Sequence, residues 1–459
     1  MRRLRPETTY LVYSTGEGFF FHLMSVLFSV FLIVELDLGP LQLLLMGTVL
    51  EVTYLLFEVP TGVVADTVSR RLSVVIGLFG TGAAFLLLGV SGSFTVAMIS
   101  QALWGVFATF QSGADVAWLT DEIGEQAAQP MYLRSEQWWQ AGSLAGIVVG
   151  VTIASFTNLR TSILVSGAGF VVLGLFMALA MREENFRPER REGERLHTSL
   201  ATTVREGAAA VRAHHVLLLI LGTAALHGMS TEGFDRLSDL HLIEDIGLPT
   251  LGGLALPVWF GVLDGGALVL GIGALAIVKR RVHLQGHAAV ARVLAVVDIV
   301  LVVSAVAFAL VASFWWALAA FWVVGTLRSV REPVFTAWIN QGLDAKTRAT
   351  INSVGGQADA IGQAAGGPGI GLIARSVSVP TALVVSGLLR LPALFLYARA
   401  IRRGTVGTLA PGEIDEELHL EEDASDPPHE GPETSGPHDP PEAPHAPESP
   451  GSPEAPVAG

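Results

Sequence analysis

The stretch PTGVVADTVSRRLSVVIG, residues 60–77, places a glycine, an acid and two adjacent arginines between two long apolar runs. These residues are Gly62, Asp66, Arg70 and Arg71, and their spacing is G-x-x-x-D-x-x-x-R-R. Each flanking run has about 20 residues, enough to cross the hydrocarbon core of a bilayer as a helix. The stretch is therefore predicted to be a short charged loop between two membrane-spanning helices. Gly62 would allow close helix approach, and Asp66 would pair with a basic group or cap a neighbouring helix.

Similar apolar runs recur along the body of the chain, which is 51% hydrophobic and only 15% charged. A water-soluble protein of this length would show shorter amphipathic stripes with wet faces. We therefore predict an all-α integral membrane protein with twelve transmembrane helices, at residues 8–34, 40–65, 72–92, 94–118, 137–157, 160–181, 216–240, 256–279, 287–311, 313–340, 350–375 and 378–401.

The basic residues predict how these helices are oriented, because cytoplasmic loops carry an excess of Lys and Arg. In the twelve-helix arrangement almost all of them fall on one side, at 2–5, 70–71, 134, 182–212, 279–281, 292, 346–348 and 399–403. The opposite loops hold only Arg160 and Arg375. Both termini are therefore predicted to be cytoplasmic, in a plasma (inner) membrane protein.

The net charge of −14 comes from the C-terminal end of the chain. Beyond Arg403 there is no Lys or Arg, while 14 Asp and Glu follow together with 12 prolines. This composition cannot bury a core, so residues 404–459 are predicted to be a disordered, acidic, Pro-rich tail. Residues 182–215 are polar and basic and are predicted to be a cytoplasmic linker.

The two predicted six-helix segments, residues 1–181 and 216–403, resemble one another at a constant offset of 220. The matches are Gly105 with Gly325, Ala117-Trp118 with Ala337-Trp338, Gln137 with Gln357, Gly142 with Gly362, and Ala145-Gly146 with Ala365-Gly366. Two pseudo-symmetric six-helix bundles are a transporter architecture, with the substrate site between repeats near the middle of the membrane.

The loop motif resembles the signature loop of the major facilitator superfamily, and the chain is similar to the bacterial twelve-helix drug:proton antiporters of that family. This resemblance implies that Gly62, Asp66, Arg70 and Arg71 latch the two halves together on the cytoplasmic side. The motif departs from the family pattern at Ser69, where a glycine is usual.

The resemblance also has departures within the helices. The antiporters usually have an arginine in the fourth span, where this chain has Gln101, and a proline in the fifth span. The fifth span here has Gly142, Gly146 and Gly150 at four-residue spacing, and the proline lies in the eleventh. Tight helix packing and a gating hinge are both open for these positions and for Gly362, Gly366, Gly367 and Pro368.

In the family, helices 1, 4, 7 and 10 line the central cavity, and on these helices we find six acids and three bases. Glu17, Glu232, Asp235 and Asp239 are predicted to handle protons or a cation. The remaining cavity-lining candidates are Gln101, Trp104, Gln111, Asp115, Arg236, Arg328, Arg331 and Glu332. An acidic cavity suits a cationic or amphiphilic substrate, or protons carried on buried carboxylates.

The charged stretch STEGFDRLSDLHLIED, residues 230–245, has two open interpretations. Its charges share one helical face and line the cavity, or the helix ends there and the charges lie in an outer loop.

The sequence predicts a secondary transporter and not an enzyme, since it has no cysteine and no HExxH, Walker or G-x-S-x-G motif. We expect proton-coupled efflux of a small drug-like molecule by a monomer, with no cofactor, no metal and no nucleic acid partner. The alternatives are a metabolite importer or exporter of the same fold, and a polytopic sensor or scaffold that signals through the acidic tail.

Overall fold

The computed structural model describes residues 4–188, 215–250, 253–281, 287–340 and 345–403. The contacts form one compact unit, Met1–Thr408, and a second unit, Leu409–Gly459, which lies outside the described residues. The predicted tail also lies outside them, as does most of the predicted linker 182–215.

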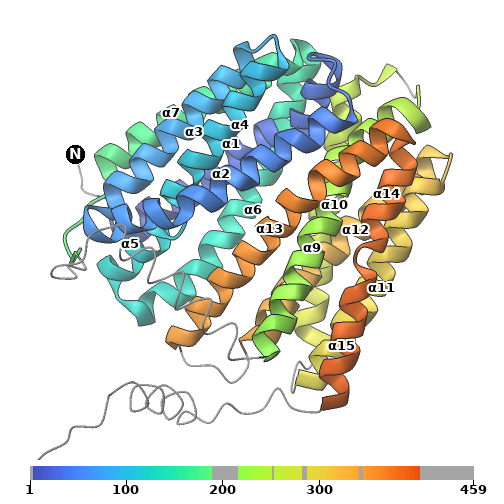
Figure 1. Ribbon diagram of the computed structural model, residues 1–459. Coiled ribbons are helices and arrows are strands. Elements are labelled where there is room, and N and C mark those ends of the chain that lie inside the picture. The colour runs from blue at the N-terminus through green and yellow to red at the C-terminus, as the bar shows by residue number, and fades with distance from the viewer. Residues whose placement is uncertain (1–3, 189–214, 251–252, 282–286, 341–344, 404–459) are drawn as a thin grey trace, which may run out of the picture. The chain divides into compact units, whose positions relative to one another are not determined.

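Every secondary-structure element in these described ranges is helical (Figure 1). The N-terminal helices are α1 (Pro6–Val34), α2 (Pro40–Thr67), α3 (Arg70–Val90), α4 (Phe94–Gln111), α5 (Ala114–Ile123), α6 (Glu125–Phe156) and α7 (Leu159–Ala180). The C-terminal helices are α9 (His215–Leu240) with a π-helical turn η1 (His241–Ile246), α10 (Leu256–Arg281), α11 (His287–Leu310), α12 (Phe314–Ile339), α13 (Ala345–Ser376), α14 (Val379–Leu388) and α15 (Leu391–Arg403).

The outer faces of these helices are apolar, as a lipid environment requires. Phe156, Leu179 and Trp316 are 86%, 79% and 71% exposed. Within the described ranges, nine helices are long and apolar enough to cross a membrane, counting α4 with α5 and α14 with α15 as single spans. The chain is therefore a multi-pass membrane protein. The nine do not include α9, α12 and α13, so the count of twelve stays a prediction.

The largest difference from the predicted boundaries lies between residues 119 and 136. This polar stretch was expected to be a loop, whereas α5 continues to Ile123 and α6 begins at Glu125. The chain turns at Gly113 (φ 72°) and Gly124 (φ 82°), a left-handed region that favours glycine. The end of an apolar run marks where hydrocarbon ends, but it does not end a helix.

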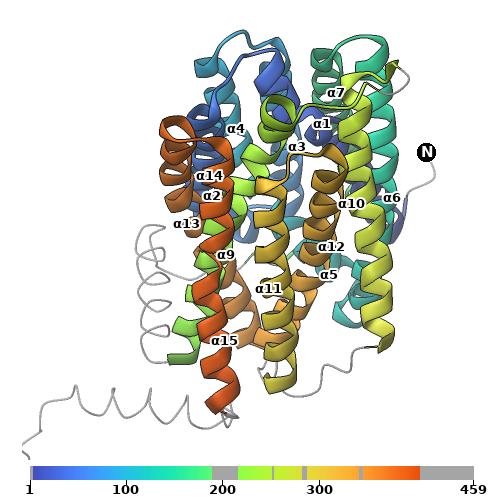
Figure 2. The ribbon, with the colours of Figure 1, turned by 90° about the vertical axis from the view of Figure 1, so that its right-hand side faces the viewer.

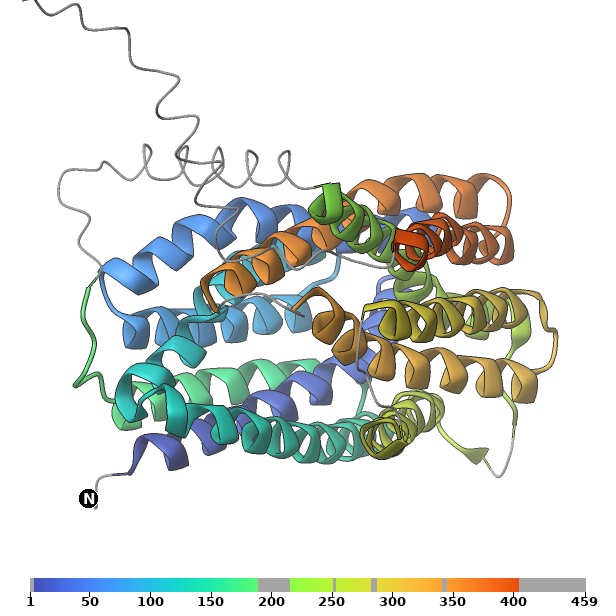
Figure 3. The ribbon, with the colours of Figure 1, turned by 90° about the horizontal axis from the view of Figure 1, so that it is seen from below.

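Two helix pairs approach each other closely along glycine-lined faces, α1 with α6 and α9 with α13 (Figure 3). A Cβ atom at Gly142, Gly146 or Gly150 on α6 would lie only 2.2–2.4 Å from a backbone oxygen of α1. On α13, a Cβ at Gly362 would lie 2.1 Å from the Ala225 oxygen of α9. Glycines at these positions let the backbones touch, which favours tight helix packing over a hinge there.

The N-terminal helices contact the C-terminal helices mainly through α2 with α13 and α6 with α10. Figure 1 shows α2 beside α13, and Figure 2 looks onto α10, α11 and α15 from the C-terminal side. A Cβ at Gly371 of α13 would lie 2.9 Å from Leu41 Cδ1 of α2, and one at Gly261 of α10 would lie 2.7 Å from Val151 Cγ2 of α6. These close contacts lie at the end of the helices that is far from the Gly62–Arg71 segment.

We predict that Gly146→Ala destabilises the protein because its Cβ would lie 2.2 Å from the Phe19 backbone oxygen, which cannot move without displacing α1. Overpacking of this kind costs about 1–3 kcal/mol. The matched control is Gly273→Ala in α10, where no described atom lies within 4 Å of the added Cβ. Thermal unfolding of both purified variants tests this, and equal transition temperatures would contradict it.

Candidate functional site

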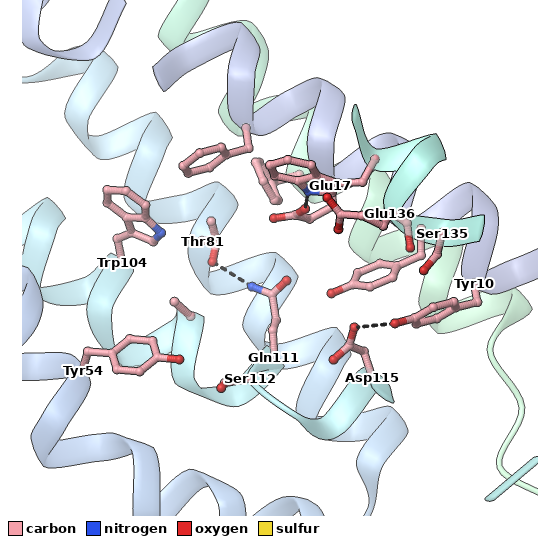
Figure 4. A pocket seen from close by; sticks show the side chains of 16 residues that line it. Tyr10, Glu17, Tyr54, Thr81, Trp104, Gln111, Ser112, Asp115, Ser135 and Glu136 are labelled. Carbon is pink, nitrogen blue, oxygen red and sulfur yellow. Dashed lines mark hydrogen bonds between the residues drawn. The ribbon is translucent and has the colours of Figure 1, made fainter. Parts of the chain in front are cut away.

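A cavity of about 500 Å³ lies among the N-terminal helices (Figure 4). Helices α1 to α7 all contribute to it. The lining residues are Tyr10, Tyr13, Ser14, Glu17, Phe21, Tyr54, Thr81, Trp104, Ala108, Gln111, Ser112, Asp115, Ser135, Glu136, Trp139 and Phe170. The volume lies within the range of sites that bind small molecules.

The cavity wall is acidic and aromatic. Three lining residues are carboxylic acids, Glu17, Asp115 and Glu136, and seven carry Phe, Tyr or Trp rings. None of the lining residues, all within the described part of the chain, is Lys, Arg or His. Such a wall attracts a cation by its carboxylates and by the negative faces of its rings.

Neutral donors hold the two innermost carboxylates. The Trp139 indole N–H donates to Glu17 Oε2, and the Tyr10 hydroxyl donates to Asp115 Oδ2 at 3.4 Å. Figure 4 shows both side chains directed toward the same space. Neither contact neutralises the carboxylate, so each acid keeps capacity for a proton or a positively charged group.

Local backbone structure explains how Asp115 reaches the cavity. The break between α4 and α5 falls at Ser112 and Gly113, and Asp115 lies in the first turn of the new helix. The partial positive charge of a helix N-terminus stabilises a carboxylate there. Nearby, Gln111 donates to the Thr81 hydroxyl at 3.1 Å, and the missing side chain of Gly77 leaves room for Gln111.

Four of the residues predicted to line a cavity or to handle protons line this one, namely Glu17, Trp104, Gln111 and Asp115. Gln101 lies on the same helix as Trp104, but it is 1% exposed and does not line the cavity. The lining residues Tyr10, Tyr13, Tyr54 and Trp139 were not predicted from the sequence. The spacing of Tyr10, Tyr13, Ser14, Glu17 and Phe21 on one helical face was a signal that could have found the α1 wall.

The charged stretch of α9 is helical throughout, since the helix runs to Leu240 and continues as η1. Two of its acids have arginine partners. Glu232 is 1% exposed and accepts a hydrogen bond from Arg236 Nε at 3.1 Å, and Asp235 accepts two from Arg328, one of them 2.7 Å long. Unlike these two, Asp239 accepts from the Ser29 hydroxyl of α1. None of these α9 side chains lines the acidic cavity.

Arg331, expected to line the cavity, lies inside the C-terminal helices and is 2% exposed. Its Nε donates to Asp298 Oδ1 at 2.9 Å, and Arg390 Nη1 donates to the same oxygen at 3.0 Å. Arg390 lies at the break between α14 and α15, and its Nη2 also reaches His227 Nδ1 at 2.5 Å. The neighbouring Glu332 side chain is 65% exposed, and its Oε2 lies 3.8 Å from Arg331 Nη1 at the edge of this cluster.

The Gly62–Arg71 segment is tied to α5 and to the chain after α7. Arg70 Nη1 lies 2.6 Å from Asp121 Oδ2, and Arg70 Nη2 lies 3.8 Å from Asp66 Oδ1. Glu183 accepts from the backbone N–H groups of Arg70 and Arg71, at 2.6 and 3.1 Å. It therefore caps the N-terminus of α3.

Two details of this segment differ from what its motif predicts. No described atom lies within 4 Å of a Cβ built at Gly62, so the expected close approach at Gly62 is not seen in the described part of the chain. Ser69, which departs from the motif, acts as the N-cap of α3, accepting from the Leu72 N–H at 3.0 Å and donating to Glu183 at 2.5 Å. Its hydroxyl gives a capping bond that glycine could not make.

The described residues contain no group of three or more His, Asp or Glu side chains arranged to hold a metal ion.

Comparison with known proteins identifies related sequences. The profile of the Major Facilitator Superfamily matches residues 10–366. A curated protein of Bacillus subtilis (strain 168), the uncharacterized MFS-type transporter YxaM, is 21% identical over 209 residues. That alignment covers 46% of this chain and 52% of YxaM, so the chain spans about half the length of this curated relative.

Solved structures with the same fold include three transporters. The nucleoside transporter NupG superimposes with a TM-score of 0.68 at 10% identity, over 87% of this chain and 100% of NupG. A bacterial homolog of the human lysosomal transporter Spinster, in its inward-facing and unoccupied conformation, gives 0.67 at 13% identity over 87% and 97% of the two chains. The peptide transporter POT in complex with sulfate gives 0.66 at 14% identity over 87% and 95%. At these identities the likeness shows the fold alone.

We predict that Asp298→Asn destabilises the protein strongly, because two buried guanidinium groups would lose their shared counter-ion. Removing one partner from a buried ion pair costs about 3–5 kcal/mol. Asp37→Asn is the matched control, since Asp37 is exposed and its left-handed backbone (φ 52°) suits asparagine. Thermal unfolding measures both variants, and an Asp298→Asn protein as stable as the control would show that the cluster does not depend on the charge.

Proposed function

The chain belongs to the Major Facilitator Superfamily, and on this premise we propose that it exports a small cationic or amphiphilic organic molecule in exchange for protons. The two groups of helices, α1–α7 and α9–α15, move relative to each other and expose the cavity to one side of the membrane at a time. The observation that carries the proposal is the acidic, aromatic cavity, which has no Lys, Arg or His among its described lining residues.

The wall chemistry supports a positively charged substrate. A cation in this cavity would meet Glu17, Asp115 and Glu136 together with the faces of Tyr, Trp and Phe rings. Cation–π contacts give up to about 2 kcal/mol when desolvated, and carboxylates attract more strongly in a low dielectric than in water. The three carboxylates would repel an anion, and a neutral solute would leave their negative charges without a counter-ion.

The contacts of the acids indicate which of them carry the proton. Glu232 and Asp235 are each bonded to an arginine, so protonation would break an ion pair. Glu17 and Asp115 accept from the uncharged Trp139 and Tyr10, so either can take up a proton or a cationic substrate without losing a salt bridge. We assign proton and substrate competition to Glu17 and Asp115, with Asp239 beside Ser29 as the further candidate.

The packing of the helices supports movement as rigid groups. The α1–α6 and α9–α13 pairs are packed backbone to backbone at Gly142, Gly146 and Gly362, which resists bending within each pair. The cavity wall includes Asp115 of α5 and Ser135 and Glu136 near the start of α6, at the end that carries the Gly62–Arg71 segment. If that end is cytoplasmic, as the basic loops predict, substrate enters the cavity from the cytoplasm.

The transport prediction uses purified protein in proteoliposomes with an imposed pH gradient and a fluorescent organic cation such as ethidium. We expect uphill movement of the dye in exchange for protons, abolished when an ionophore collapses the gradient. Glu17→Gln and Asp115→Asn should each lower the rate about tenfold or more, the loss expected from removing a charged partner of a buried group. Glu125→Gln, an exposed acid at the start of α6, should transport normally.

Two results would contradict the proposed function. Normal transport by both cavity variants would remove the carboxylates from the mechanism. Accumulation of an anionic or neutral solute with no movement of any organic cation would favour the metabolite importer or exporter instead.

A second prediction concerns Asp66, whose side chain is 51% exposed and lies beside the Arg70–Asp121 ion pair. Asp66→Asn should slow the transport cycle severalfold, because it changes the charge balance of a cluster that the motif predicts to change partners between conformations. Dye affinity, measured by fluorescence anisotropy, should stay within about twofold of the wild type, since Asp66 does not line the cavity. A large loss of affinity with normal turnover would contradict this assignment.

A further inference from the structure

Gly47 of α2 lies directly against a buried ion pair of α9. A Cβ atom built at Gly47 would lie 1.7 Å from Glu232 Oε1 and 2.6 Å from Arg236 Nε. Glu232 and Arg236 are one helical turn apart and bonded at 3.1 Å, and the Glu232 side chain is 1% exposed. Only a glycine at position 47 leaves room for this pair.

A second glycine borders the same space from α13. A Cβ at Gly367 would lie 2.5 Å from Thr48 Oγ1 of α2 and 3.7 Å from Glu232 Cγ. The Glu232 side chain therefore occupies a gap whose walls are Gly47 of an N-terminal helix and Gly367 of a C-terminal helix. We call this arrangement the Gly47–Gly367 contact.

The Gly47–Gly367 contact lies at the end of α2 far from the Gly62–Arg71 segment. Gly47 precedes Gly62 by fifteen residues, about 22 Å of helix at 1.5 Å per residue. The close contacts of Gly371 with Leu41 and of Gly261 with Val151 lie at the same end. Tyr54, which lies between Gly47 and Gly62 on α2, lines the acidic cavity. The cavity therefore lies on the Gly62 side of this contact.

We propose that the Glu232–Arg236 pair closes the protein at the end of α2 that is far from the Gly62–Arg71 segment. The pair does so by filling the space between α2 and α13, and not by its charge. Gly47 is the residue that admits it. The inference rests on the alternating access of the proposed function. The Gly47–Gly367 contact must separate when the protein opens at this end and closes at the end of the Gly62–Arg71 segment.

The composition of the pair explains why such a closure is reversible. Both charged partners belong to α9, and no salt bridge among the described residues joins either of them to α2, so the Glu232–Arg236 bond stays intact when α2 moves away. Only the longer-range attraction between Arg236 and Glu51 of α2 is lost. Separation exposes the pair to water, and hydration of the two charges offsets the packing that is lost. An ion pair bridging α2 and α9 would instead have to be broken in every cycle, at the cost of two uncompensated charges.

The consequence is that a methyl group at position 47 penalises only the conformation in which this end is closed. Glu232 cannot move aside freely, because it is buried, bonded to Arg236 and bordered by Gly367. Gly47→Ala should therefore shift the population toward the conformation in which this end is open and the cavity is closed on the other side.

The test uses thiol labelling, for which the chain is well suited because it contains no cysteine. Leu44→Cys reports on the closed end, since Leu44 is 0% exposed and packs against Gly371 of α13. Ala108→Cys reports on the cavity that it lines. Each reporter is combined with Gly47→Ala or with the control Gly273→Ala, and maleimide labelling rates are measured in nanodiscs, where both faces of the membrane are accessible.

We expect Gly47→Ala to raise the labelling rate of the Leu44→Cys reporter about tenfold, within the range expected for overpacking a filled contact, and to lower that of Ala108→Cys. Gly273→Ala should change neither rate. A rise at position 44 with no fall at position 108 would mean a local packing defect and would overturn the proposal, as would unchanged rates at both positions.

Two further variants test whether the volume or the charge of the Glu232 side chain closes this end of the protein. Glu232→Gln keeps the volume and should leave the Leu44→Cys reporter protected, whereas increased labelling would show that closure depends on charge. Glu232→Ala removes the closer of the two clashes and releases Arg236 from its partner, so that the Arg236 side chain can move away from the added methyl group. It should therefore restore protection to Gly47→Ala, and the double variant also gives a readout if the single variant fails to fold.

Labelling needs no substrate, so the two proposals fail independently. If no organic cation is transported but the reciprocal labelling change is observed, the closure stands and the substrate assignment falls.

Discussion

The cost of placing a charge among apolar helices shapes this protein more than any other constraint. Isolated charges in such surroundings are expensive and need partners. Several acids of the C-terminal helices have charged partners, as in Asp298 with Arg331 and Arg390. In the cavity, Glu17 accepts a hydrogen bond from an indole and Asp115 accepts one from a phenol. These neutral donors do not compensate the negative charge of the carboxylates. The first arrangement is suited to holding helices together, and the second to binding a cation or a proton.

Glycine positions decide where this chemistry can be placed. Because α1 touches α6 at backbone distance, Glu17 of α1 lies within reach of Trp139 of α6. The same kind of contact at Gly362 joins α9 to α13. Side chains of ordinary size at these positions would push the helices apart and separate the carboxylate from its donor.

Much of the helical architecture could be predicted from sequence because hydrophobic runs report directly on hydrocarbon thickness. Helix ends outside the apolar core could not, as the polar start of α6 at Glu125 shows. The acids of the site were visible as charges in apolar runs. Their partners were not, since Tyr10 with Asp115 and Arg390 with Asp298 are joined by tertiary packing across 105 and 92 residues of sequence.

The two groups of helices share a packing pattern but differ in their interiors. Gly142 and Gly362, and Gly146 and Gly366, occupy corresponding positions at the 220-residue offset. A Cβ at Gly142 or Gly362 would lie 2.1–2.2 Å from a backbone oxygen of the neighbouring helix, and the contact at Gly366 is looser than that at Gly146. The interiors differ: the N-terminal helices enclose an acidic, aromatic cavity, and the C-terminal helices enclose a buried ion cluster. In the proposed mechanism, the N-terminal helices bind the substrate and the C-terminal helices form the group against which they move.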